Sequence, residues 1–444
     1  MATHDDYRAA LDHARRLADS FLDGLARRPV IAGAMPAAPA PPDGTGLDAA
    51  ICLVEQSIVP HLSASPGPRY LGFVTGGATP EALAADWIAS AWDQNVSNEV
   101  GSIAASLEAA TVATFARHFG LPDGLRGHFV SGATAANLVA MATARQWAQR
   151  ATGSLPTVFA GAAHSSIGKA LAITGIGRDR LRSVATRPGR TAVDVAALRD
   201  ALGAHVGPAV VVASAGEVNT GDFDDLLQVG AACREHGAWL HVDGAFGLFA
   251  AFDDALRGRL DGIALADSVT VDLHKWLNVP YDSAMVYTTR PDLQREVFAA
   301  TSAYLGDDPD PLHYTPENSR RFRAFAAWMV MAVRGRAGIG RWVADNCRQA
   351  RQLAQGLRDL GFDVLNEIHL NIVAFAPREP GASARDALLA RINGTGEVFM
   401  TPTVLHGRPA IRAAFSNWST TEADVARILV AIERTHGPLA GGEA

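Results

Sequence analysis

The chain is poor in cysteine, in basic charge and in long apolar runs. Its three cysteines, Cys52, Cys233 and Cys347, lie far apart and form no paired-cysteine metal spacing. Neither a disulfide framework nor a structural zinc site is expected, and a reducing cytoplasm is the predicted location. The formal net charge is -7, so the chain lacks the basic stripe with which a protein neutralises nucleic-acid phosphates. We expect no nucleic-acid partner.

Membrane segments are not expected either. No apolar run approaches the roughly 20 residues needed to span a bilayer. The N-terminus carries Asp5, Asp6 and Arg8 where a signal peptide has its apolar core. The 444 residues are 48% hydrophobic and 19% charged, a balance typical of a soluble globular enzyme with two or three domains.

Short apolar runs alternate with helical stretches through the middle of the chain. Amphipathic stretches such as 193–202 and 226–236 separate the runs. Strand and helix in alternation predict an α/β fold with a mostly parallel sheet that helices cover on both faces. In such sheets ligands bind beyond the carboxyl ends of the strands. The predicted strands are 128–130, 157–160, 181–185, 209–213, 239–242, 268–271 and 284–288.

The remaining segments divide the chain into three regions. Residues 1–80 are expected to form an N-terminal arm, with a helix over 5–27 and an extended Ala/Pro-rich connector. The connector, residues 35–42, either packs on a partner subunit or is a plain linker. Residues 81–335 would form the large α/β domain, and residues 336–444 a small C-terminal α+β domain. The elements predicted after residue 319 are helices at 320–335, 342–360, 383–392 and 422–434, and strands at 362–365, 371–375 and 410–415.

A lysine follows one of the predicted strands. Residues 268–271 are a β-branched run, and Asp272, His274 and Lys275 come directly after it, beside Trp276. A lysine amine in apolar surroundings loses part of its charge and becomes a nucleophile toward carbonyl groups. Lys275 is therefore a candidate for a Schiff base with a carbonyl compound. The alternative is a structural lysine whose stem packs beside Trp276.

The strand at 128–130 turns through small residues into an alanine-rich helix. Unpaired N–H groups at a helix start, together with the helix dipole and the Thr134 hydroxyl next to Ala133, suit a phosphate group. Small residues also allow a tight turn without any ligand, so this alternative stays open. The segment is not a hydrolase nucleophile elbow, because Phe129 stands where a glycine should precede Ser131 by two.

Further predicted strands contain or precede polar residues. Strand alternation places His241 and Asp243 on one face, and Asp243 needs a cationic or hydrogen-bonding partner because it follows an apolar run. A metal between them is an alternative, but no third ligand has a convincing spacing. His164, after the strand at 157–160, suits stacking on a flat ring or proton transfer. Arg412, a cation within an apolar strand, requires an anion, either a substrate carboxylate or a structural salt-bridge partner.

Together these residues fit one cofactor, pyridoxal 5'-phosphate. Its aldehyde needs the lysine, its phosphate needs a helix N-terminus, and its pyridine nitrogen needs a carboxylate that keeps it protonated. From about residue 66 to residue 434 the chain also resembles the group II pyridoxal-phosphate-dependent amino-acid decarboxylases, which include aromatic-amino-acid and glutamate decarboxylases. The motifs that carry the resemblance are Ala133-Thr134, His164-Ser165-Ser166, His241-Val242-Asp243, Ala266-Asp267-Ser268, His274-Lys275-Trp276-Leu277, Ser319-Arg320-Arg321-Phe322 and Arg412 with Asn417 and Thr420-Thr421.

The resemblance implies a fold-type-I, pyridoxal-phosphate transferase-like architecture and a homodimer with active sites at the subunit interface. It also implies roles. Lys275 would bind the cofactor covalently, Asp243 would pair with its ring nitrogen, His164 would stack on the ring, and Tyr304 would protonate the substrate carbon. Further cofactor contacts are implied for Ala133, Thr134, Ala245, Asp272 and His274.

The substrate would contact Phe73, Thr75 and Arg412 by the same resemblance. An acid at position 272, where the family often has asparagine, would oppose a phosphate unless a proton or cation intervenes. The implied reaction is decarboxylation of an aromatic or acidic L-amino acid to its amine. Oxidative deamination to an aldehyde, a carbon–carbon lyase reaction and a catalytically silent homologue that binds the cofactor are the alternatives. Other departures from the family pattern are Gly244, Leu273 and Glu217-Val218-Asn219.

Overall fold

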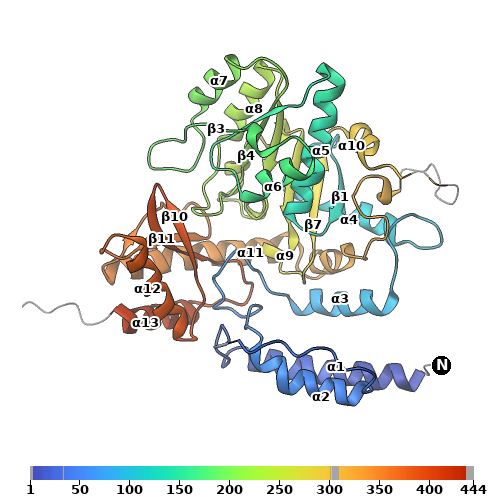
Figure 1. Ribbon diagram of the computed structural model, residues 1–444, viewed down its shortest axis with the longest axis vertical. Helices are drawn as coiled ribbons and strands as arrows, with labels where there is room; N and C mark the ends of the chain where they lie inside the picture. Colours follow the sequence, from blue (N-terminus) through green and yellow to red (C-terminus); the bar gives the residue numbers. More distant parts are fainter. Residues whose placement is uncertain (1–3, 34, 301, 303–309, 437–444) are drawn as a thin grey trace, which may run out of the picture.

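A seven-stranded sheet forms the middle of the molecule in the computed structural model, which describes residues 4–33, 35–300, 302 and 310–436 (Figure 1). The strands lie in the order β1-β7-β6-β5-β4-β2-β3. Strands β2 to β6 run parallel to one another, and β7 is antiparallel to both of its neighbours. The predicted α/β fold with a mostly parallel sheet is confirmed. The strands are β1 (Arg126–Val130), β2 (Thr157–Ala160), β3 (Leu181–Ser183), β4 (Ala209–Ser214), β5 (Trp239–Asp243), β6 (Ser268–Asp272) and β7 (Ala284–Thr288).

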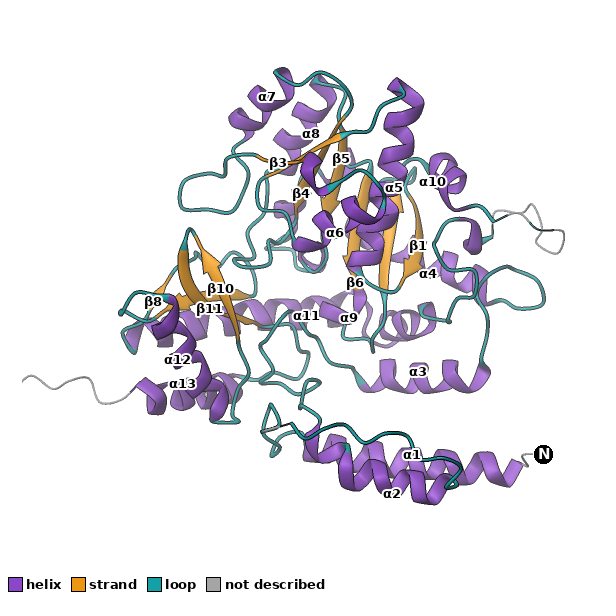
Figure 2. Cartoon of the chain, in the orientation of Figure 1, coloured by secondary structure: helices purple, strands orange, loops and turns teal. Residues whose placement is uncertain are grey.

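Helices cover both faces of this sheet (Figure 2). Val210 and Val212 of β4 belong to the buried cluster that contains residues of α5 and α6, and Val211 belongs to the cluster that contains residues of α4 and α8. Alternate β-branched residues of one strand thus fill two cores, as expected for a strand buried on both faces. The helices of this part are α3 (Pro80–Trp92), α4 (Ala104–Phe119), α5 (Ala133–Thr152), α6 (Ser165–Ile173), α7 (Val195–Gly203), α8 (Leu226–Glu235), α9 (Leu273–Trp276) and α10 (Pro291–Phe298).

A second, antiparallel sheet lies toward the C-terminus, with strand order β10-β11-β9-β8. Its edge strand β10 is not predicted from the sequence, because Thr401, Pro402 and Thr403 leave no apolar run there. The sequence offers Ser419 or Thr421 as the cap of the last helix, and the structure has Thr421, which exchanges hydrogen bonds with Asp424 at the start of α13. The elements are β8 (Asp363–Val364), β9 (Ile372–Ala376), α12 (Ala382–Gly394), β10 (Thr401–Leu405), β11 (Arg408–Ala414) and α13 (Glu422–His436).

One long helix, α11 (Ala324–Asp359), runs between the two sheets (Figure 1). The sequence predicts two helices here, and the structure has helix on both sides of a kink at Gly335, where φ is 57° and ψ is -175°. Glycine adopts a positive φ without a side-chain clash. The predicted start of the first helix at Arg320 is wrong. The Arg320 guanidinium is buried in an ion pair with Glu108, and the main-chain N–H of Arg320 donates to Oδ1 of Asn95. The divisions after residues 80 and 335 stay predictions.

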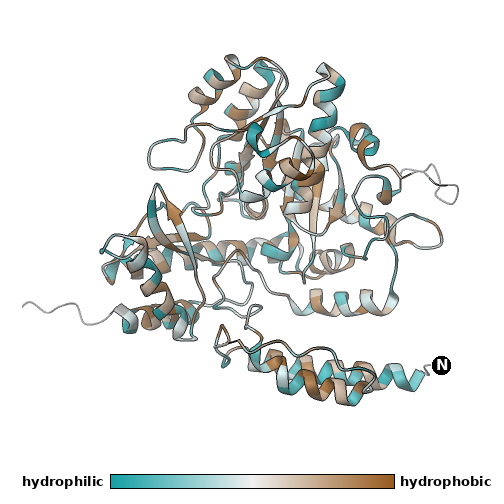
Figure 3. Cartoon of the chain, viewed as in Figure 1, coloured by the Kyte–Doolittle hydropathy of each residue, from teal (hydrophilic) through white to brown (hydrophobic). Residues whose placement is uncertain are grey.

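Two helices, α1 (His4–Gly24) and α2 (Leu47–Ser57), lie side by side at the N-terminal edge of the molecule. No residue of α1 is buried, although both helices carry apolar side chains (Figure 3). Residues 35–46, which include the predicted connector, form neither helix nor strand. None of the described helices is both long and apolar enough to cross a membrane. Short 3-10 helices are η1 (Val59–His61), η2 (Arg178–Arg180), η3 (Gly247–Phe252), η4 (Arg257–Leu260), η5 (Ile263–Leu265) and η6 (Pro311–His313).

Candidate active site

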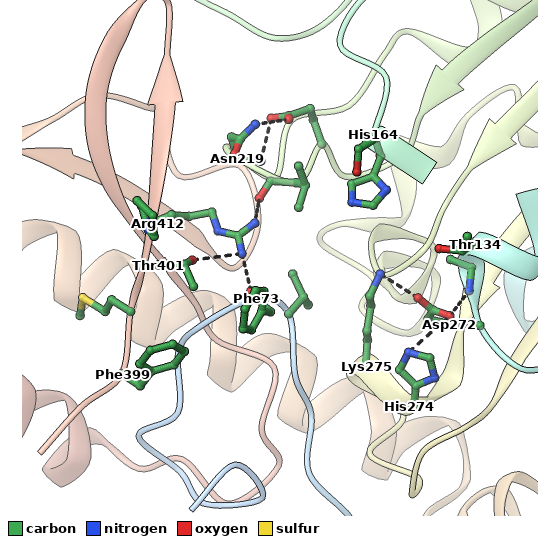
Figure 4. A pocket seen from close by; sticks show the side chains of 18 of the residues that line it. Phe73, Thr134, His164, Asn219, Asp272, His274, Lys275, Phe399, Thr401 and Arg412 are labelled. Carbon is green, nitrogen blue, oxygen red and sulfur yellow. Dashed lines mark hydrogen bonds and ion pairs between the residues drawn. The ribbon is translucent and has the colours of Figure 1, made fainter. Parts of the chain in front are cut away.

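A large cavity lies beyond the carboxyl ends of the parallel strands (Figure 4). Its volume is about 940 Å³. Residues that follow β1, β2, β4 and β6 form one wall, and the loop around residues 73–74 and the C-terminal sheet form the other. A recess of about 30 Å³ adjoins the cavity and reaches the end of β5. Ten of the residues predicted from the sequence line these spaces, namely Phe73, Ala133, Thr134, His164, Asp243, Ala245, Asp272, His274, Lys275 and Arg412.

Lys275 lies on α9, the single helical turn that follows β6. Its ammonium group is 2.7 Å from Oδ2 of Asp272, whose side chain is 3% exposed. Oδ1 of Asp272 accepts a hydrogen bond from the N–H of Ala133, at the start of α5, with a distance of 2.5 Å between the nitrogen and the oxygen. The same oxygen is 3.6 Å from Nε2 of His274. The acid predicted to oppose a phosphate therefore has its charge balanced by Lys275 and by the positive end of α5.

Asp243 is buried at the end of β5 and accepts two hydrogen bonds. Oδ1 accepts from the N–H of Ala245 at 3.1 Å, and Oδ2 accepts from the side-chain amide of Asn137 at 3.0 Å. The predicted need for a partner is thus met by hydrogen bonds. In the part of the chain that the structure describes, no group of three His, Cys, Asp or Glu side chains is placed to hold a metal ion.

His164 is the N-cap residue of α6. Its Nδ1 accepts a hydrogen bond from the N–H of Ser166 at 3.2 Å and lies 2.7 Å from the Ser166 hydroxyl. Burial lowers the pKa of His164 below its usual value, and the charge of Asp243 offsets part of this shift. The ring is therefore neutral near pH 7 and fixed in orientation, which suits stacking on a flat cofactor.

Arg412, on β11, binds two loops at the opposite wall of the cavity. Its guanidinium donates to the carbonyl oxygens of Val218 at 2.8 Å and Phe73 at 2.9 Å. Burial lowers the pKa of Arg412 to about 10, and the carboxylate of Glu217 opposes this shift. Among the described residues, Nε of Arg412 has no hydrogen-bond partner. The guanidinium is thus largely occupied by main-chain oxygens, and its contact with a substrate carboxylate stays a prediction.

Phe73 and Thr75, both predicted to contact the substrate, lie on one loop, and one of the two lines the cavity. Phe73 lines the cavity with its ring 6.2 Å from that of Phe399. Thr75 is not among the lining residues, and its carbonyl oxygen accepts from the Ser416 hydroxyl at 3.1 Å. Tyr304 lies outside the described residues. Lining residues to which the sequence reasoning assigned no role are Asn219, Tyr281, Leu389, Asn393, Phe399 and Met400.

Gly76 brings the same loop against the turn that contains the lysine. A Cβ at Gly76 would lie 1.7 Å from the carbonyl oxygen of Lys275 and 3.0 Å from Oδ1 of Asn278. No residue larger than glycine fits there without movement of the loop. The backbone of this loop therefore approaches the backbone of Lys275 closely at Gly76.

Comparison with known proteins agrees with this arrangement. The model of the pyridoxal-dependent decarboxylase conserved domain matches residues 35–378. The chain belongs to this family of pyridoxal-dependent decarboxylases. It is therefore a pyridoxal-phosphate-dependent carboxy-lyase that acts on amino acids.

Several relatives of this decarboxylase are similar over most of their length. It is 27% identical over 387 residues to the aromatic-L-amino-acid decarboxylase of Bacillus atrophaeus, covering 82% of this chain and 80% of that protein. The Sus scrofa enzyme of the same name is 29% identical over 445 residues, with 89% and 88% covered. Oryza sativa TDC, solved with PLP and tryptamine, has a TM-score of 0.91 at 24% identity, with 98% of each chain covered. Catharanthus roseus tryptophan decarboxylase, solved with L-tryptophan, has a TM-score of 0.89 at 20% identity, also with 98% of each chain covered. These structures show that the fold is of type I.

The residues present fit pyridoxal phosphate. An amine at Lys275, a buried carboxylate at Asp243 and a helix start at Ala133 and Thr134 line one continuous site. The cofactor supplies an electron sink for the electron pair left behind when a substrate carboxylate departs. Lys275 would hold it covalently, Asp243 would face its ring nitrogen, and the start of α5 would receive its phosphate.

Proposed function

We propose that this decarboxylase acts on aromatic L-amino acids and releases the corresponding amine. The observation that carries the proposal is the composition of the wall across the cavity from Lys275 (Figure 4). Phe73, Phe399 and Leu389 offer apolar contacts to an aromatic ring. Arg412 is a cation in this wall. Because its guanidinium already donates to two main-chain carbonyl oxygens, few of its N–H groups remain to bind an acidic side chain of a substrate. The two curated relatives described above, both aromatic-L-amino-acid decarboxylases, support the same substrate class.

The side chains of the cavity have separate tasks in this proposal. Lys275 holds the cofactor and exchanges a proton at Nζ. Asp243 stabilises a proton on the ring nitrogen with a carboxylate oxygen. His164 packs against the ring as a neutral imidazole and limits its movement. Phe73 lines the cavity and would exclude water from the reacting carbon.

We assign the last proton transfer to Tyr304. Loss of carbon dioxide leaves an electron pair at the substrate α-carbon, and an amine forms when an acid protonates that carbon before oxygen reacts with it. A phenol supplies such an acid. Without it, reaction with oxygen would give an aldehyde, ammonia and peroxide, which is the competing outcome.

A homodimer with sites at the interface completes the proposal. Large apolar side chains are exposed on α3 and on the segment that leads to α4, and exposed apolar surface of this kind is common at protein interfaces. The helix α1, which has no buried residue, would pack on the partner subunit. The free cysteines support a cytoplasmic location. The exposed apolar residues are Trp87, Ile88, Trp92, Val100 and Ile103.

A product assay tests the proposed function. The purified holoenzyme is incubated under air with L-tryptophan, L-tyrosine, L-phenylalanine, L-glutamate and L-aspartate, and carbon dioxide, amine, aldehyde and peroxide are measured. We expect equal amounts of carbon dioxide and amine from one or more aromatic substrates. The Tyr304→Phe variant should retain the cofactor and shift its products toward aldehyde and peroxide. A preference for an acidic substrate, or aldehyde as the main wild-type product, would contradict the proposal.

A further inference from the structure

A chain of buried hydrogen bonds runs from the middle of the large sheet toward the inner end of the cavity. The indole nitrogen of Trp239, on β5, lies 2.9 Å from the hydroxyl oxygen of Ser268. This hydroxyl lies 2.9 Å from Nδ1 of His241. Nε2 of His241 lies 3.0 Å from Oδ1 of Asn137, on α5. Ser268, His241 and Asn137 are each 0% exposed, so water does not compete for these bonds.

At Asn137 this chain of hydrogen bonds divides into two branches. Its amide nitrogen donates to Oδ2 of Asp243 and to the hydroxyl of Ser166, each at 3.0 Å. The Ser166 hydroxyl lies 2.7 Å from Nδ1 of His164. One branch therefore ends at the carboxylate that would face the cofactor nitrogen. The other ends at an imidazole in the cavity wall.

The two ends of the chain fix the position of each proton. The indole N–H of Trp239 can only donate, so the Ser268 hydroxyl accepts from it. The carboxylate of Asp243 can only accept, so Asn137 directs its amide nitrogen to it and its oxygen to His241. The proton of the neutral His241 ring therefore lies on Nε2, and the Ser268 hydroxyl donates to the unprotonated Nδ1. Burial lowers the pKa of His241 to about 4, so the ring is neutral near pH 7.

We propose that Asn137 is a positioning residue that sets the proton arrangement at Asp243 and His164 together. Its donated bond keeps the Asp243 carboxylate oriented as an acceptor toward the cofactor nitrogen. The Ser166 hydroxyl, having accepted from Asn137, donates to Nδ1 of His164, so the proton of His164 lies on Nε2. The inference deepens the proposed function and rests on it for the reaction, but not for the hydrogen-bond chain.

The Asn137→Asp variant tests this role with little change in shape. When ionised, its carboxylate still accepts from His241 but cannot donate to Asp243 or Ser166, and its charge lies beside that of Asp243. We expect the cofactor to remain attached to Lys275, while the visible absorption band of its protonated form weakens. The value of kcat should fall by about ten- to a hundredfold, because a buried charged acceptor loses its donor, with a much smaller change in KM.

Asn366→Asp is the matched control. Asn366 is a buried amide outside the cavity that donates to the carbonyl oxygens of Thr220, Glu367 and Ile372 and accepts from the N–H of Ala374. The same substitution there also replaces a buried side-chain donor by a carboxylate. We expect a lower Tm and an unchanged cofactor spectrum.

Two further variants separate the branches and remain informative if Asn137→Asp does not fold. Ser268→Ala removes the hydroxyl that donates to Nδ1 of His241. The His241 proton is then no longer held on Nε2, and the Asn137 amide can turn. We therefore expect the absorption band of the cofactor to weaken. Ser166→Ala cuts the branch to His164 alone, so kcat should fall while the band persists. A wild-type spectrum and kcat in Asn137→Asp, or in Ser268→Ala when Asn137→Asp is unfolded, would overturn the proposal. The absorption readout needs no amine product, so a failed product assay would count against the proposed function and leave this inference to be decided by the spectra.

Discussion

Asp272 places a carboxylate at the helix start where the cofactor phosphate would bind. It pairs with Lys275 and accepts from the N–H of Ala133. An amide at this position could still accept from Ala133 without repelling a phosphate, and it would free Lys275 from its ion pair. We predict that Asp272→Asn lowers the Kd for pyridoxal phosphate by about tenfold. Spectroscopic titration of the apoprotein measures this, and pyridoxal without its phosphate should gain less.

Asp224→Asn is the control for this prediction. Asp224 is also a buried carboxylate that accepts from main-chain N–H groups, those of Ser214 and Val193, but it does not line the cavity. Its substitution should leave the Kd for pyridoxal phosphate near the wild-type value. Weaker cofactor binding by Asp272→Asn would show that the carboxylate assists loading.

Single residues are predictable from the sequence when they directly follow a strand. Lys275, Asp243 and His164 stand out because an apolar run ends just before each of them, and the structure brings all three to one cavity. Asn137 lies on the alanine-rich helix that follows the strand at 128–130 and has no such signal. Its partner Asp243 is 106 positions away, and only the packing of α5 on the sheet brings them together.

The loop that contains Gly76 is the element on which the shape of the site most depends. A methyl group at this position would overlap the carbonyl oxygen of Lys275. We predict that Gly76→Ala lowers the free energy of unfolding by about 1–3 kcal/mol through overpacking, and lowers kcat by displacing the loop. Urea unfolding and steady-state kinetics measure the two effects. Gly124→Ala, where a Cβ meets nothing within 4 Å, should change neither, and equal effects of both substitutions would refute the explanation.

The strands of the large sheet are easier to predict from the local sequence than the elements elsewhere in the protein. β-branched runs buried on both faces predict β2 and β7 at their observed bounds. The edge strand β10 gives no such pattern, because Pro402 lies within it and both Pro402 and Val404 are exposed. The bounds of α11 depend on the long-range ion pair of Arg320 with Glu108, which local periodicity cannot reveal.

At the scale of the whole molecule, the exposed apolar patch on α3 and the following segment predicts self-association. Val100 is 84% exposed within this patch, and Val206 is 95% exposed on a separate turn between α7 and β4. We predict that Val100→Asp shifts the protein from dimer toward monomer and reduces activity, while Val206→Asp changes neither. Light scattering after size-exclusion chromatography measures the mass. A monomeric wild-type protein with full activity would contradict the interface.

Attachment of the cofactor to Lys275 is the claim on which the whole account depends, and the chain is well suited to test it because it contains only two lysines, Lys169 and Lys275. The holoenzyme is reduced with borohydride, digested and analysed by mass spectrometry, beside the Lys275→Ala and Lys169→Arg variants. The account predicts the reduced cofactor on Lys275 in the wild type and in Lys169→Arg, and no adduct and no carbon dioxide release in Lys275→Ala. An adduct on Lys169, or turnover by Lys275→Ala, would contradict it.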